Sequence, residues 1–259
     1  MLFQRKNKKL NTRKAQKLLQ KAEKNGDQAL LFKIYREAED AGIRFAVYQK
    51  LVREEKQVCF GGMEWFVLKE EDDCQLLLSK YALKSMTFGN ETTQKHYEGE
   101  GMYHTVHCSW KQSMIRAFLT KLYLDLPEED RKLVLPVSTE GNYGSYNILT
   151  EVCEGQAKTV DRMFVMSICD YLQYCRTSIA LRTSFHSDGT AACCWSRTEG
   201  NTFIQHGIWT TTYAAFGPAD DLEIIPEKYS PNIVSVRIDK TADIRLAIWI
   251  KTVDKSPVA

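Results

Sequence analysis

The chain has 259 residues, of which 44% are hydrophobic and 26% charged, and such a length buries a full core without metals or crosslinks. Its apolar runs are far shorter than the roughly 20 residues that a bilayer requires, and no apolar segment follows the basic N-terminus as in a secretory signal. We therefore expect an intracellular protein, cytoplasmic or nuclear, without a transmembrane segment. The net charge of +2 is unevenly distributed, because residues 1–24 carry +8 and the remaining chain −6.

Residues 12–25 have the periodicity of an amphipathic helix, with Thr12 as its expected N-cap. The apolar face consists of small and medium side chains: Ala15, Leu18, Leu19 and Ala22. A stripe of lysines lies about 130° away at 100° per residue: Lys14, Lys17, Lys21 and Lys24. We expect this segment to contribute little to the core, so that removing residues 1–24 leaves the rest folded.

Two further short helices are predicted after this one. Asp27 is the expected cap of the second helix and Gly42 its expected stop. The third is predicted over residues 43–56. These helices define a basic helical N-terminal segment, residues 1–57, followed by an α+β body, residues 58–259.

The first part of the body alternates between strand and loop patterns. Short apolar runs predict strands at residues 63–69 and 75–79. Residues 87–101 and 141–145 are polar and contain glycines, which indicates loops. Residues 110–124 have helical periodicity and give the first of two long helices.

The second long helix is predicted over residues 159–174. Its expected buried face contains Val160, Phe164, Ile168 and Leu172, whose spacing follows the helical period. We expect this face to pack against a sheet in the C-terminal third of the chain.

The C-terminal third is predicted to be rich in strands. Residues 179–185 and 191–197 flank Asp188-Gly189, which is a strong hairpin signal. Three further strands are predicted over residues 203–214, 233–238 and 244–252. The predicted class is therefore α+β: an N-terminal helical segment followed by a mixed body with a C-terminal antiparallel sheet packed by two long helices.

Eight cysteines are scattered along the chain, including the adjacent pair Cys193 and Cys194. Because we expect an intracellular protein with a full core, we predict that they are reduced thiols. The two adjacent cysteines would point to opposite faces of a strand and could not easily bind one metal.

The sequence lacks a Walker loop, a Gly-x-Ser-x-Gly elbow, a Gly-x-Gly-x-x-Gly loop and a His-Glu-x-x-His motif. His104, His107 and Cys108 form the densest cluster of potential zinc ligands, but a second spaced pair is missing. Asp188, close to His186, is expected to serve as a turn residue. We therefore predict no metal and no cofactor, and a small hydrolase or nuclease that uses these histidines or a cysteine is the alternative.

The basic segment carries the leading hypothesis of a non-enzymatic structural or binding protein that attaches to nucleic acid, RNA above all. The contacts are expected from its cationic side chains: Arg5, Lys6, Lys8, Lys9, Arg13, Lys14, Lys17, Lys21 and Lys24. An anionic membrane surface is the alternative ligand, because basic amphipathic helices also bind such surfaces. A third possibility is an adaptor whose N-terminal helices bind a protein partner.

A basic arm ahead of a compact β-containing body resembles the layout of viral coat and matrix proteins. The resemblance is one of layout and rests on no motif. It implies a structural protein whose body self-associates into a homo-oligomer.

Overall fold

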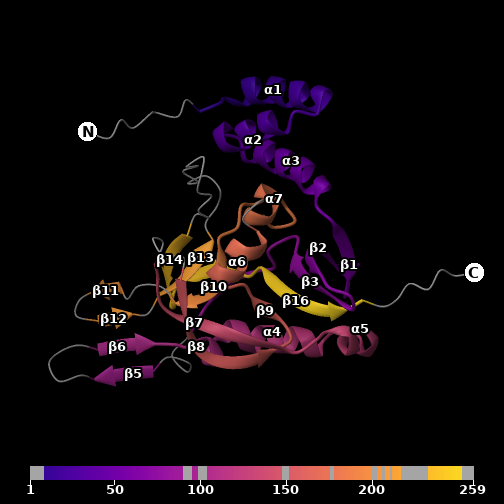
Figure 1. Cartoon of the computed structure of the whole chain (residues 1–259). Helices are drawn as coiled ribbons and strands as arrows, with labels where there is room; N and C mark the ends of the chain where they lie inside the picture. The colour runs from indigo at the N-terminus through magenta and orange to yellow at the C-terminus, as the bar shows by residue number, and fades with distance from the viewer. Residues whose placement is uncertain are drawn as a thin grey trace, which may run out of the picture.

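A computed structural model describes residues 9–89, 95–98, 104–147, 152–175, 178–199, 203–205, 208–210, 212–216 and 233–252. Helices and mostly antiparallel sheets are both present, so the predicted α+β class is confirmed (Figure 1).

Three helices occupy the N-terminal part: α1 (Thr12–Asn25), α2 (Gln28–Glu37) and α3 (Ala41–Leu51), followed by the short η1 (Val52–Glu54). Each of the three longer helices begins with a side chain that accepts a backbone N–H of its first turn, from Asn11, Asp27 and Asp40 respectively. Gly42 was expected to end α2 but lies inside α3, because Asp40 caps α3 just before it. Figure 1 shows α1 outermost, with α2 and α3 between it and the rest of the chain.

The first five-stranded sheet is antiparallel and combines strands from both ends of the chain. Its order is β1 (Gln57–Phe60), β2 (Met63–Glu70), β3 (Cys74–Ser79), β16 (Leu246–Lys251) and β9 (Phe164–Val165). Gly61 and Gly62 both have positive φ, 56° and 73°, in the tight turn between β1 and β2. The C-terminal strand β16 thus pairs with a strand of the N-terminal half.

The second five-stranded sheet also combines strands that are far apart in the sequence. Its order is β14 (Ile233–Arg237), β13 (Thr212–Phe216), β10 (Cys194–Glu199), β15 (Thr241–Asp243) and β4 (Ser85–Thr87). The pair β10–β15 is parallel and the other pairs are antiparallel.

The remaining strands form two smaller sheets. One has the order β11 (Phe203–Gln205), β12 (Ile208–Thr210), β6 (His104–His107) and β5 (Lys95–Glu98), and the other is the long hairpin of β7 (Val137–Asn147) and β8 (Val152–Asp161). The remaining helices are η2 (Trp110–Gln112), α4 (Met114–Leu124), α5 (Glu128–Leu133), α6 (Ile168–Tyr174) and α7 (Ile179–Arg182).

The predicted long helix over residues 159–174 is wrong. Its first three residues belong to β8, and the helix α6 begins only at Ile168, after a capping box between Ser167 and Asp170. In β8 burial alternates with period two, so Val160 is 66% exposed while its neighbours Thr159 and Asp161 are buried. Of the predicted face, Phe164 and Ile168 are buried and Leu172 is half-buried.

Three other local predictions also fail. Residues 141–145, expected to be a loop, belong to β7, and β5 lies inside the predicted loop 87–101. Residues 179–182, expected to be a strand, form the helix α7. In the first two cases backbone pairing with a neighbouring strand stabilises a polar segment that lacks strand propensity of its own.

The predicted turn at Asp188-Gly189 is confirmed. The N–H of His186 donates to the carbonyl oxygen of Thr190 at 2.8 Å, and Gly189 has a φ of 88°. The carboxylate of Asp188 accepts the N–H of Thr190 at 2.8 Å, as expected of a turn aspartate.

The prediction that every cysteine is reduced is wrong for Cys169, which is disulfide-bonded. Among the described residues, the cysteines outside a disulfide are Cys59, Cys74, Cys108, Cys175, Cys193 and Cys194. We expected reduced thiols because a chain of this length can bury a full core without a crosslink. A large core does not prevent two nearby thiols from forming a disulfide.

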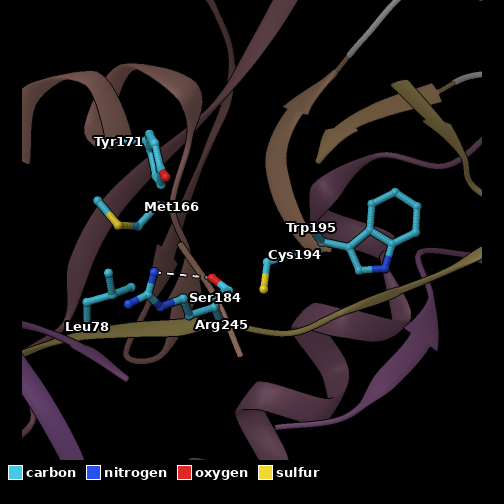
Figure 2. Close-up of a pocket in the computed structure, with 7 residues that line it drawn as sticks. All are labelled: Leu78, Met166, Tyr171, Ser184, Cys194, Trp195 and Arg245. Atoms are coloured by element: carbon cyan, nitrogen blue, oxygen red, sulfur yellow. Dashed lines mark hydrogen bonds between the residues drawn. The ribbon is translucent and has the colours of Figure 1, made fainter. Parts of the chain in front are cut away.

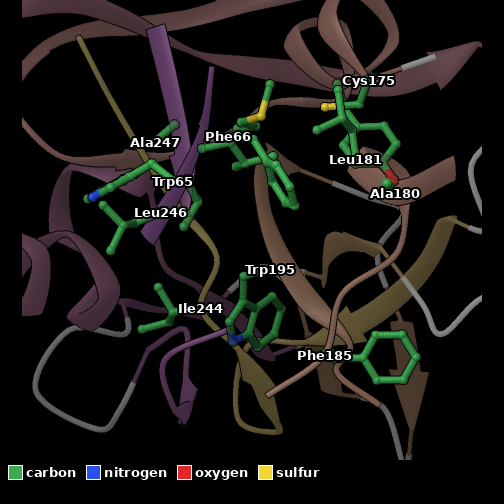
Figure 3. Packing of buried hydrophobic residues seen from close by; sticks show 14 of the residues in the cluster. Trp65, Phe66, Cys175, Ala180, Leu181, Phe185, Trp195, Ile244, Leu246 and Ala247 are labelled. Atoms are coloured by element: carbon green, nitrogen blue, oxygen red, sulfur yellow. The ribbon is translucent and has the colours of Figure 1, made fainter. Parts of the chain in front are cut away.

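One hydrophobic cluster extends from Leu10 in the N-terminal part to Ile250 in β16. Phe185 lies where the helices meet the rest of the chain, and its ring centroid is 4.7 Å from that of Tyr48 and 5.3 Å from that of Phe45, both on α3. Phe185, Trp195 and Leu181 belong to this same cluster, and Figure 3 labels all three. The helical part therefore packs on the body through aromatic contacts, while the domain boundary at residue 57 stays a prediction.

Replacing Phe185 with alanine should lower the free energy of unfolding by about 3–5 kcal/mol, because a large buried ring is lost between three other rings. Urea unfolding followed by circular dichroism measures this loss. The exposed Val160→Ala change is the control and should cost less than about 1 kcal/mol. A loss that small for Phe185→Ala would show that the helices do not depend on this contact.

Asp161 anchors the β7–β8 hairpin on α4. Its carboxylate accepts hydrogen bonds from Trp110 Nε1 at 3.0 Å and from Arg116 Nε at 2.6 Å, and the hydroxyls of Thr139 and Thr159 also donate to it. Burial alone would raise the pKa of Asp161, but the four donors outweigh burial and the pKa lies below its usual value.

Because the folded-state pKa of Asp161 is lowered, its ionisation stabilises the fold above about pH 4 and this contribution is lost as the pH falls further. Asp161→Asn should therefore destabilise the protein by about 2–4 kcal/mol at pH 7, with a smaller difference below pH 4. Urea midpoints at both pH values test this, with exposed Asp125→Asn as the control. A difference between wild type and Asp161→Asn that does not change with pH would contradict the assignment.

Candidate nucleic-acid interface

The helix α1 begins and ends on local signals. The side chain of Asn11 accepts the N–H of Lys14, and Gly26 ends the helix in the left-handed conformation with a φ of 63°. Asn11 rather than Thr12 is therefore the cap. The helix is otherwise as the sequence predicts.

The cationic side chains of α1 lie together on its outer side. At 100° per residue, five of them fall within an arc of about 100° around the helix axis. All five are exposed: Arg13, Lys14, Lys17, Lys21 and Lys24. We refer to these five residues as the cationic face.

The cationic face is not neutralised by neighbouring carboxylates. Glu23, the one acidic residue of α1, pairs instead with Lys50 of α3, with 2.7 Å between Nζ and Oε1. Within the described ranges, neither these five cations nor Lys9, which is exposed ahead of the helix, takes part in an ion pair. Their charge is therefore available to a ligand.

The first turn of α1 borders a depression of about 730 Å³. It is lined by Asn11, Thr12, Arg13, Lys14 and Lys17. Three cations of the cationic face thus line this shallow depression. The predicted contacts Arg5, Lys6 and Lys8 lie outside the described residues.

The opposite side of α1 is buried against α2 and α3. Ala15 and Ala22 have no exposed surface, and Leu18 and Leu19 pack on the same cluster from half-buried positions. Just before the helix, Leu10 is buried and its N–H donates to the carbonyl oxygen of Glu37 at 2.6 Å. The small side chains of α1 allow this close approach.

The expectation that residues 1–24 contribute little to the core is therefore wrong. Few large apolar side chains are present, but alanines on a helix bury their surface completely when the partner helices come close. The cationic face is held at a fixed orientation by this packing.

Removing residues 1–24 should lower the free energy of unfolding by about 2–5 kcal/mol, because Leu10, Ala15 and Ala22 are lost and their partners on α2 become exposed. Urea unfolding of the shortened chain measures this. An unchanged midpoint would show that α1 is a detachable arm after all.

His186 belongs to a second polar cluster, which the sequence did not reveal. Its Nε2 lies 3.2 Å from Oδ1 of the buried Asp243 in β15. The hydroxyl of Ser85 donates to the same oxygen, and the N–H of Cys193 donates to Oδ2 at 2.8 Å. The carboxylate thus connects three segments that are far apart in the chain.

This cluster lacks the order that nucleophilic catalysis needs. Ser85 donates to the carboxylate and not to the imidazole, so the hydroxyl is not aligned with a base. Burial, and then the charge of Asp243, raise the pKa of the Cys193 thiol to about 11, whereas a nucleophilic cysteine has a lowered pKa. The cluster therefore serves to hold these segments together.

The metal site considered at His104 and His107 gains no support from the described residues. His104 and His107 lie on β6, but their side chains are outside the described part. Among the residues whose side chains are described, no three His, Cys, Asp or Glu gather as metal ligands would. Within the described ranges, no helix has both the length and the apolar composition that crossing a membrane requires.

Comparison of the chain with known protein families, with curated proteins and with solved structures found no match.

Proposed function

We propose that the protein binds nucleic acid through the cationic face of α1, without base specificity. One observation carries this proposal: five exposed cations share one side of a helix whose other side is buried. A buried apolar face fixes the helix, and an unpaired cationic face supplies the charge that releases counterions from a polyanion.

The dimensions of the cationic face suit a nucleic-acid backbone. With a rise of 1.5 Å per residue, Arg13 and Lys24 are separated by about 16 Å along the helix axis. One strand of a duplex presents a charge about every 3.4 Å of axis, so this length corresponds to about five phosphates. Each cation can therefore reach its own phosphate.

The buried apolar face favours nucleic acid over a membrane. An interfacial helix binds lipid by inserting its apolar side among the acyl chains. In α1 that side is formed by Ala15 and Ala22, which are already buried, and by Leu18 and Leu19, which pack on the cluster. Insertion would require α1 to leave α2 and α3.

Lysine and arginine contacts to phosphates position a nucleic acid but do not read its bases. We therefore expect binding with little sequence preference and with strong dependence on salt. A mixed-sequence, single-stranded RNA of about 20 nucleotides is a suitable probe.

The association constant for this RNA should fall as salt is added. In a plot of its logarithm against the logarithm of the salt concentration, we expect a slope of about −3 to −4 for four to six phosphate contacts. Replacing Lys14, Lys17, Lys21 and Lys24 with glutamine should flatten the slope by about 3. Fluorescence anisotropy at several salt concentrations measures both slopes.

The control variant carries the same change in net charge elsewhere. Lys111, Lys121, Lys240 and Lys251 are also exposed, and their replacement with glutamine should leave the slope close to that of the wild type. Equal slopes for the two variants would show that net charge and not the cationic face governs binding. Binding to anionic vesicles without binding to RNA would replace the proposal with a membrane surface.

A further inference from the structure

Arg245 is a buried cation between the two five-stranded sheets, in the link from β15 to β16. It is 5% exposed. Its Nε donates to the carbonyl oxygen of Ser79 at 3.0 Å, and its Nη1 donates to the carbonyl oxygens of Leu181 at 2.6 Å and Thr183 at 3.1 Å. Nη1 also lies 3.2 Å from Oγ of Ser184.

The second terminal nitrogen of the guanidinium, Nη2, is buried and forms no hydrogen bond with any described residue. Within the described part of the chain, no carboxylate pairs with this guanidinium, whose Cζ lies over the ring of Phe66 at 5.7 Å from the centroid. A buried positive charge with two free N–H groups is costly unless something binds them.

Arg245 lines a small cavity. The cavity is about 10 Å³, which is room for about one water-sized particle. Figure 2 shows Arg245 and Ser184 on one side, joined by their hydrogen bond, with Cys194 beside them. The other lining residues are Leu78, Met166, Tyr171 and Trp195.

Several polar groups of the cavity can donate hydrogen bonds. Nη2 offers two N–H groups. The hydroxyl of Ser184 accepts from Nη1 and shares a hydrogen bond with the thiol of Cys194, whose S–H can act as the donor and leave the hydroxyl hydrogen of Ser184 for a ligand. Cys194 is a neutral thiol, because burial raises its pKa to about 12. The hydroxyl of Tyr171 is already engaged as donor to the carbonyl oxygen of Arg182.

We propose that this cavity binds one halide ion, chloride under ordinary conditions, held by Nη2 of Arg245 and the hydroxyl of Ser184. The ion supplies the counter-charge that the guanidinium lacks. A water molecule in the same place would leave the positive charge of the guanidinium without a counter-charge. Sulfate, phosphate and organic anions are too large for a cavity of this volume.

The direct test is diffraction from crystals of the wild-type protein grown or soaked in bromide. We expect an anomalous peak in the cavity next to Nη2 of Arg245. Density at this position without an anomalous signal identifies water and overturns the proposal, as does an empty cavity.

The second test is the thermal midpoint in potassium bromide compared with potassium glutamate at equal ionic strength. Glutamate cannot enter, so bromide alone should raise the midpoint, by about 5–10 °C at about a hundredfold excess over its dissociation constant. Equal midpoints in the two salts overturn the proposal.

Ser184→Ala removes one donor and leaves Arg245 in place. It should weaken the bromide affinity about tenfold, whereas exposed Ser138→Ala should not change it. The bromide effect should persist when Lys14, Lys17, Lys21 and Lys24 are replaced by glutamine. Loss of the effect in that variant would place the halide on the cationic face and overturn the assignment to Arg245.

Discussion

The arrangement of the molecule depends on the hydrogen bonds that the guanidinium of Arg245 donates to three backbone carbonyl oxygens. Arg245 lies in the link between β15 and β16, which belong to different sheets. By donating to Ser79 at the end of β3 and to Leu181 and Thr183, it fixes the segment around α7 against the first sheet. An apolar residue at position 245 would leave three buried carbonyl oxygens without these donors, which would weaken the attachment of this segment to the first sheet.

The position of the helices follows from this constraint. Phe185 comes directly after the segment that Arg245 holds, and its ring packs against Tyr48 of α3. The hydroxyl of Tyr48 also donates to the carbonyl oxygen of Lys80, one residue beyond Ser79. Because α3 and α2 are fixed in this way, α1 can bury Ala15 and Ala22 against them and must turn its lysines outward. The cationic face is thus oriented by contacts that begin in the interior of the body.

The sequence predicted those features whose signals are local. The three N-terminal helices, the capping role of Asp27 and the turn at Asp188-Gly189 follow from short-range periodicity and side-chain chemistry, and so does the stripe of lysines. The sequence could not show that β8 is a strand, because the donors that fix Asp161 come from Trp110 and Arg116, more than 40 residues away. The pairing of β16 with β3, the tie between His186 and Asp243 and the burial of α1 are likewise long-range. Local sequence patterns do not reveal such long-range contacts.

A prefolded cationic face of α1 that contacts RNA can be detected by a two-dimensional NMR titration of the ¹⁵N-labelled protein with short single-stranded RNA at low salt. We expect chemical-shift changes that concentrate on Arg13, Lys14, Lys17, Lys21 and Lys24, while the amides of Ala15 and Ala22 keep their protection from hydrogen exchange. Shifts centred on another surface, or loss of protection at Ala15 and Ala22 on binding, would contradict this expectation.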